Sequence, residues 1–228
     1  MPEKHTLGSF DQDLDLLRDA VQHLADLTQN AIKNAMQALL SSDHDLAQVV
    51  IDSDLVINQL QQQILFQMNI VLARQQAMAQ DLREIMAAGR IAAHLERVAA
   101  HAKNIARRTL ELDRTVDEEI GSQLIWMNER ISSMLQQVMG AYQRRNVEES
   151  IIAWSSDDEL DRVYSKLFLH LLDRMQHNPD SIKTAILLLF IAKGLEREGD
   201  HVINIAEEIH FMVTGTPLRS LGSTLDSH

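Results

Sequence analysis

The chain has 228 residues and carries 33 acidic side chains against 21 lysines and arginines, which gives it a formal net charge of −12. A surface of this charge repels the phosphates of DNA, RNA and anionic lipids, so the composition predicts no nucleic-acid partner. Because cysteine is absent, disulfides, thiolate metal sites and cysteine nucleophiles are excluded. Hydrophobic residues make up 45% of the chain, and only 8 glycines and 3 prolines interrupt it, which favours long helices around a folded core.

Apolar residues recur at helical spacing along nearly the whole chain and predict an all-α protein with six long helices. We expect these helices at about residues 10–40, 45–74, 79–112, 116–144, 147–177 and from the turn at 178–180 to 213. Capping and turn residues mark the connections, as in Ser41-Ser42-Asp43 and Asn178-Pro179-Asp180, and Gly215 stops the last helix.

The longest purely apolar run covers residues 185–192, far short of the roughly 20 residues that a membrane-spanning helix needs. The N-terminal stretch MPEKHTLGSF has no apolar signal core. We therefore expect a soluble, cytoplasmic protein that is at most peripheral to membrane complexes.

An internal repeat with an offset of 100 residues is the most informative feature of the sequence. Residues 91–106 (IAAHLERVAAHAKNIA) and 191–206 (IAKGLEREGDHVINIA) share nine of sixteen letters. The second and fifth expected helices match more weakly, at an offset of 103 residues. A fixed-period repeat predicts a duplicated structural unit. We expect three-helix bundles at residues 1–113 and 114–215, followed by a flexible tail at 216–228.

The third helix of each expected bundle carries one apolar stripe at steps of three and four residues, which predicts a buried seam. Small residues on the stripe, such as Gly199, allow helices to approach closely. The two stripes are Ile85, Ala88, Ala92, Leu95, Ala99 and Ala102, and Ala185, Leu188, Ala192, Leu195, Gly199 and Val202.

Two acidic pairs lie next to the second seam: Glu196 with Asp200, and Asp157 with Asp161. On antiparallel helices they would form a patch of four carboxylates, and all-oxygen sites suit Mg, Ca, Mn or Fe better than Zn. Chance alone produces roughly five acidic pairs at this spacing in such an acidic chain. The spacing therefore leaves open whether a bound cation, or solvent with nearby arginines, compensates these charges.

The sequence contains no nucleophile elbow and no phosphate-cradling loop. Two Glu-x-x-His pairs, Glu198 with His201 and Glu207 with His210, are nine residues apart on one expected helix. At 3.6 residues per turn they lie on opposite faces and cannot share a di-iron site. We therefore expect that the protein is not an enzyme.

The segments LERVAAHAKNIA (95–106) and LEREGDHVINIAEEIHFMVTG (195–215) resemble the two signature stretches of the PhoU family. QAMAQDLREI (76–85) resembles the opening of the family's third helix. The similarity covers about residues 6–215. It implies two three-helix bundles, with acidic motifs that hold surface metal clusters in some members.

Transferred to this sequence, the resemblance implies a metal site at Asp157, Asp161, Glu196 and Asp200, without distinguishing Fe, Mn, Mg and Zn. In the first bundle only a remnant matches, Asp54 and Glu96. The partner positions hold Asn58 and Ala100. We therefore expect weak or no metal binding there, unless His94 or His101 substitutes. His101 matches His201 in the repeat, which favours a shared packing or hydrogen-bonding role.

The resemblance further implies a negative regulator of the phosphate-starvation response, coupling the ATPase of the phosphate ABC transporter to its sensor histidine kinase. A homodimer is expected. Two alternatives remain open. A metal-dependent enzyme acting on phosphate compounds would need a perturbed general base beside the metal, which the sequence does not clearly show. A metal-free structural bundle would leave the acidic pairs without a function.

Overall fold

The computed structural model describes residues 3–74, 79–154 and 157–218, and every regular element in these ranges is helical. None of these helices combines the length and the apolar character that crossing a membrane requires. The elements in chain order are α1 (Glu3–Ser41), α2 (His44–Arg74), α3 (Ala79–Glu111), α4 (Glu118–Arg144), α5 (Val147–Trp154), α6 (Asp157–His177), the 3-10 turn η1 (Pro179–Ser181) and α7 (Ile182–Thr214).

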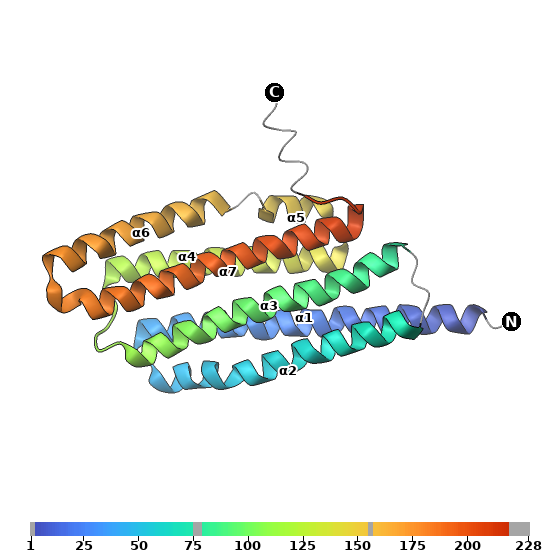
Figure 1. Ribbon diagram of the computed structural model, residues 1–228, viewed down its shortest axis with the longest axis horizontal. Helices are drawn as coiled ribbons and strands as arrows, with labels where there is room; N and C mark the ends of the chain where they lie inside the picture. Colours follow the sequence, from blue (N-terminus) through green and yellow to red (C-terminus); the bar gives the residue numbers. More distant parts are fainter. Residues whose placement is uncertain (1–2, 75–78, 155–156, 219–228) are drawn as a thin grey trace, which may run out of the picture.

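The helices form two units that follow each other along the chain. In the first unit α1, α2 and α3 pack against one another, and in the second unit α7 packs against α4, α5 and α6. Figure 1 shows α3 and α7 side by side through the middle of the molecule, where they join the two units. The predicted all-α tandem fold is confirmed. The exact limits of the two bundles remain a prediction.

The expected helix at residues 147–177 is the one clear departure from the predicted elements. The structure has two helices there, α5 and α6, so the prediction of one continuous helix is wrong. The sequence Ser155-Ser156-Asp157 repeats the pattern of residues 41–43, where the chain also leaves one helix and enters the next. Serine and aspartate compete for backbone hydrogen bonds and favour helix N-termini over interiors. Residues 155 and 156 themselves lie outside the described residues.

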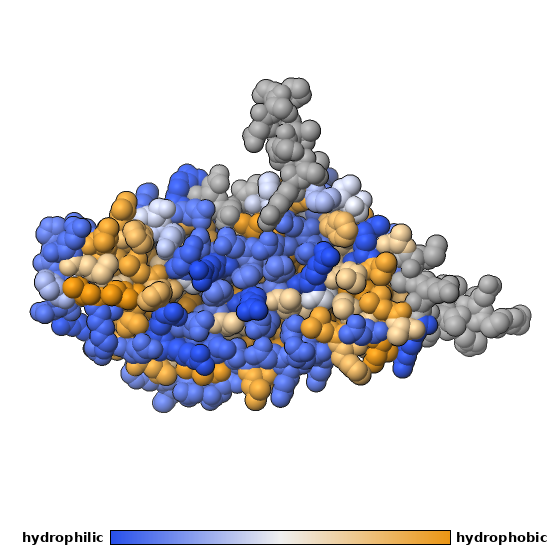
Figure 2. All heavy atoms as spheres, viewed as in Figure 1, coloured by the Kyte–Doolittle hydropathy of each residue, from blue (hydrophilic) through white to orange (hydrophobic). Residues whose placement is uncertain are grey.

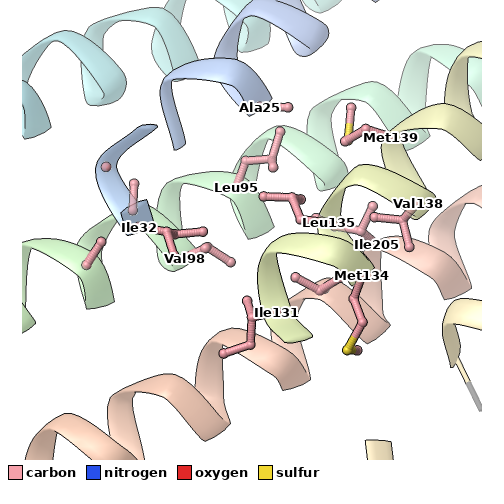
Figure 3. Packing of buried hydrophobic residues seen from close by; sticks show 14 of the residues in the cluster. Ala25, Ile32, Leu95, Val98, Ile131, Met134, Leu135, Val138, Met139 and Ile205 are labelled. Carbon is pink, nitrogen blue, oxygen red and sulfur yellow. The ribbon is translucent and has the colours of Figure 1, made fainter. Parts of the chain in front are cut away.

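One continuous hydrophobic core serves both units. Figure 3 shows Leu95 and Val98 of α3 in the same packed region as Ile131 and Leu135 of α4 and Ile205 of α7. All twelve residues of the two predicted stripes are buried, which confirms both seams. Full burial of a leucine such as Leu95 stabilises the fold by roughly 1.5–3 kcal/mol. The two units are therefore held together by the same hydrophobic effect that folds each of them.

Helices α6 and α7 come close together at Gly199. A Cβ atom at this position would collide with the Leu160 side chain. The first unit has Ala99 at the equivalent position. The glycine thus lets Leu160 of α6 reach the seam of α7, as the stripe of small residues predicted.

The central helices α3 and α7 run in opposite directions. Arg83, near the start of α3, donates from Nε to the carbonyl oxygen of Met212 at the end of α7, at 3.2 Å. Lys183, at the start of α7, pairs with Asp113 just beyond α3, at 2.6 Å. Because residues 91–106 and 191–206 are also repeat equivalents, the antiparallel pair places a pseudo-twofold axis between the middles of the two helices. Equivalent side chains therefore meet there.

The described residues just beyond α7 pack against the protein. His210 Nδ1 lies 2.9 Å from the carbonyl oxygen of Thr216, and Leu218 is buried. The remainder of the predicted tail, residues 219–228, lies outside the described part of the chain.

Candidate functional site

The predicted acidic site of the second unit lies where α6 faces α7. Burial and the neighbouring charge of Glu196 raise the pKa of Asp200, and Asp161 of α6 raises it further. Lys193 and Arg197 act in the opposite direction. The structure therefore brings three of the four predicted carboxylates into electrostatic contact. The fourth residue, Asp157, begins α6, but its side chain lies outside the described set.

Glu196 is the best-defined member of this group. Its side chain is 13% exposed, and its Oε1 accepts a hydrogen bond from Lys193 Nζ at 2.5 Å. Its Oε2 is buried and has no hydrogen-bond partner in the structure. A buried carboxylate oxygen without a donor is costly, and a hard cation bound there would remove that cost. Among the described side chains, however, no group of three or more His, Asp or Glu is already arranged around a metal position.

The equivalent place in the first unit is neutralised from within. Asp54 Oδ2 accepts hydrogen bonds from Lys103 Nζ at 2.6 Å and from Asn58 Nδ2 at 3.0 Å. The Oε2 atom of Glu96 lies 3.5 Å from the Nε atom of its neighbour Arg97. The repeat equivalent of Lys103 is Ile203, which carries no charge. The two remnant carboxylates thus have cationic partners from the chain itself, and nothing at this place calls for a metal.

Histidines from both units meet where α3 packs against α7. The Nδ1 atoms of His94 and His201 lie 3.2 Å apart, so one ring donates and the other accepts. The rings of His101 and His201 stack with centroids 5.9 Å apart. The sequence predicted a shared packing or hydrogen-bonding role for His101 and His201, and in the structure the two rings pack against each other. His94 and His101 both contact His201.

The imidazole rings of this cluster are held in the neutral form. Burial lowers the pKa of all three histidines. For His201 the other two rings, Arg97 and Arg197 add to this effect and bring the pKa to about 4. For His101 the two arginines also act downward, whereas Glu196 opposes them. Arg97 and Arg197 therefore lie close enough to this cluster for their charges to act on it.

Glu84 is a structurally important residue that the sequence patterns did not indicate. Its side chain is only 4% exposed and accepts from Arg18 Nε at 2.5 Å and from the guanidinium group of Arg145. Arg145 caps α4 in the left-handed conformation, with φ of 52°. The network ties α3 to α1 and to the end of α4, so one buried carboxylate joins the two units.

Glu198 of α7 is the second buried carboxylate among the described residues, and it is isolated. The side chain is fully buried, and neither oxygen has a hydrogen-bond partner in the structure. Burial raises its pKa well above the ordinary value, so the group is held in its protonated form. The repeat alignment contained a signal for it, because the equivalent residue is the buried Val98. Glu198 lies in the core while His201 faces His94, so the two form no joint metal site.

Taken together, the fold is a duplicated helical unit built around an antiparallel α3–α7 pair, with a histidine cluster between these two helices and an acidic site where α6 faces α7. This architecture belongs to the class of tandem helical-bundle proteins. The PhoU domain model matches residues 21–109 and 124–209, once in each half, and the chain belongs to the PhoU family.

Relatives of this family match along nearly the whole chain. A phosphate-specific transport system accessory protein PhoU homolog from Rhizobium meliloti is 35% identical, covering 100% of this chain and 99% of the relative. A homolog of the same description from Zymomonas mobilis is 36% identical, covering 97% and 94%. The crystal structure of PhoU from Pseudomonas aeruginosa superposes with a TM-score of 0.87 at 28% identity, covering 91% of this chain and all of that one.

The PhoU regulatory protein of the phosphate transport system from Streptococcus pneumoniae is also similar in structure. It gives a TM-score of 0.85 at 29% identity over 92% of this chain and 99% of that one. The likeness extends over both halves in each comparison. The tandem architecture is therefore a property of the family.

Proposed function

We propose that this protein is a negative regulator of the phosphate-starvation response, acting as an adaptor to the phosphate uptake system. The match of both halves to the PhoU domain carries the proposal, together with full-length relatives described as accessory proteins of phosphate-specific transport.

Deletion of the gene tests this proposal. In phosphate-replete medium, a phosphatase reporter of the starvation response should become constitutively active, and the gene supplied in trans should restore repression. Normal repression in the deletion strain would contradict the regulatory role. If the purified protein hydrolysed phosphate esters and the variant Glu196→Ala/Asp200→Ala did not, the adaptor role would be contradicted. The protein would then be a metal-dependent enzyme.

The proposed partners are the ATPase of the phosphate ABC transporter and the sensor histidine kinase, both at the cytoplasmic side of the membrane. Long helices that leave apolar residues at the surface support such contacts, since helical faces are common docking elements. Phe66 of α2 is 69% exposed, and Phe190 of α7 is 55% exposed. Figure 2 shows such hydrophobic areas toward both ends of the viewed face. We further propose a homodimer, which light scattering of the purified protein tests.

We also propose that Asp157, Asp161, Glu196 and Asp200 hold a metal ion between α6 and α7. The unpartnered Oε2 of Glu196 and the repulsion that Glu196 and Asp161 exert on Asp200 support this assignment. A bound cation would supply positive charge and fix the two helices to each other, without any part in a reaction. Elemental analysis after dialysis against Mn or Fe should find metal in the wild type. Glu196→Ala/Asp200→Ala should lose it, whereas Asp54→Ala/Glu96→Ala should retain it.

A further inference from the structure

The middle of the α3–α7 pair brings together cationic and imidazole side chains from both repeats. Arg97 lies three residues after His94 and four before His101, so the three share one face of α3. On α7, Arg197 lies four residues before His201. The His94–His201 and His101–His201 contacts bring the two faces together. The repeat has therefore placed the equivalent arginines, Arg97 and Arg197, on the two helix faces that meet at these histidines.

The cations at this point make few direct ion pairs. Arg197 is exposed and, within the described residues, makes no hydrogen bond or ion pair. Arg97 is 68% exposed and has only the 3.5 Å contact with Glu96. The charges that act on His201 from its surroundings all disfavour a further positive charge. Figure 2 shows hydrophilic residues across the middle of the viewed face, between hydrophobic areas toward its two ends.

Two of the nearby carboxylates have other partners, whereas Asp200 lies close enough to Arg197 for the two charges to act on each other. Glu196, which acts on His101, accepts from Lys193, and Glu207, which acts on His94, accepts from Trp154 Nε1 at 3.3 Å. Arg108, the third arginine that acts on His101, lies with its guanidinium 5.1 Å from the Phe190 ring centroid and donates to the carbonyl oxygen of Asn104. Arg97 and Arg197 are thus the exposed guanidinium groups of this cluster, and neither donates a hydrogen bond to a described residue.

We infer that Arg97 and Arg197, with the rings of His101 and His201, form a binding site for a tetrahedral oxyanion of the phosphate class. Guanidinium groups present paired N–H donors that match the oxygens of such an anion, and imidazole N–H groups add donors beside them. The choice of phosphate among oxyanions rests on the proposed function, whereas the site itself rests on the geometry.

Equilibrium dialysis of the full-length protein with radiolabelled inorganic phosphate tests the site. The wild type should bind one phosphate per chain, with sulfate competing because it has the same shape and chloride failing to compete. Arg97→Ala/Arg197→Ala should weaken binding roughly tenfold or more, because two charge-assisted contacts are lost. Arg74→Ala/Arg107→Ala removes two exposed charges elsewhere on the same unit and should bind as the wild type does.

A second measurement locates the anion. Ring resonances of His101 and His201 should shift with phosphate in the wild type and in Arg74→Ala/Arg107→Ala, but not in Arg97→Ala/Arg197→Ala. No saturable binding in the millimolar range, equal loss in both double variants, or equal competition by chloride would each overturn the inference. The reporter assay is independent of the binding assay. Derepression in the deletion strain without phosphate binding by the protein would contradict the anion site and leave the regulatory role intact. Phosphate binding with normal repression in the deletion strain would contradict the regulatory role and leave the anion site intact.

Discussion

The two halves of this molecule share a fold and a hydrophobic seam but differ in how their equivalent carboxylates are neutralised. In the first half, Asp54 is paired with Lys103 at 2.6 Å, and the neighbouring positions hold Asn58 and Ala100. In the second half, Asp161 and Asp200 take those two places and Ile203 replaces the lysine, leaving Glu196 with an unpartnered oxygen. The difference teaches that duplication preserved the packing while each copy changed its polar residues independently.

Buried carboxylates show the same divergence. Glu84 of α3 lies between two guanidinium groups, and its repeat equivalent is Thr184. Glu198 of α7 is buried without a partner, and its equivalent is Val98. Both carboxylates are buried, but only Glu84 has cationic partners. We therefore expect Glu84 to stabilise the fold and Glu198 to destabilise it, and substitutions at these and equivalent positions test this.

The largest effect is expected when the isolated carboxylate is copied into the first half. Val98→Glu buries an unpartnered acid in place of a fully buried valine and should lower the free energy of unfolding by about 4 kcal/mol. Urea denaturation followed by circular dichroism measures it. Val98→Leu, which keeps the site apolar, should lose less than about 1.5 kcal/mol. A loss for Val98→Glu as small as that of the leucine variant would contradict the comparison.

Removing the paired carboxylate should cost somewhat less. Glu84→Gln leaves the guanidinium groups of Arg18 and Arg145 without their shared anion and should lower the free energy of unfolding by about 3 kcal/mol. Glu208→Gln is the control, because its partner Arg90 is 53% exposed and such pairs contribute less than about 1 kcal/mol. Equal effects of the two variants would show that the Glu84 network does not join the units.

Removing the isolated carboxylate should instead stabilise the protein. Glu198→Leu replaces a buried, unpartnered acid by an apolar side chain of similar size and should raise the free energy of unfolding at pH 7 by about 2 kcal/mol. The pKa of Glu198 in the folded protein is well above its ordinary value of 4.5. As the pH rises past 4.5, the unfolded chain releases this proton while the folded chain keeps it, so the wild type loses stability.

The gain from Glu198→Leu should therefore be larger at pH 7 than at pH 4, where both states hold the proton. Denaturation curves of the variant and the wild type at both values measure this. A gain that does not change with pH, or a loss at pH 7, would mean that Glu198 is ionised and paired in the folded protein.

The smallest change in stability is expected when the acidic site of the second half is built into the first half. Apart from the loss of the Lys103–Asp54 pair, the free energy of unfolding should change by about 1 kcal/mol or less. The triple variant Asn58→Asp/Ala100→Asp/Lys103→Ile supplies the second half's residues at three equivalent positions. If these residues decide metal binding, elemental analysis should find twice the wild-type metal content. The single variant Lys103→Ile should not gain metal. An unchanged metal content in the triple variant would mean that the surrounding helices decide the site.

Much of the fold was predictable because helices and seams follow from local spacing. The apolar stripes of α3 and α7 indicated both buried faces, and the repeat indicated the tandem. The break between α5 and α6 was missed, although Ser155-Ser156-Asp157 resembles the earlier turn at 41–43, because apolar spacing continues across it. The acidic residues of the candidate site could be identified from the repeat and the family resemblance, and three of the four lie in electrostatic contact.

The sequence by itself determined the helical units, their duplication and the residues that differ between the copies, because these depend on neighbours within a few turns of the chain. Only the tertiary structure decided which charges are neutralised. Arg145 meets Glu84 from 61 residues away, and His94 meets His201 from 107 residues away. Such contacts arise because two antiparallel helices pack around a common axis, and the strength of an electrostatic contact depends on distance and burial in space.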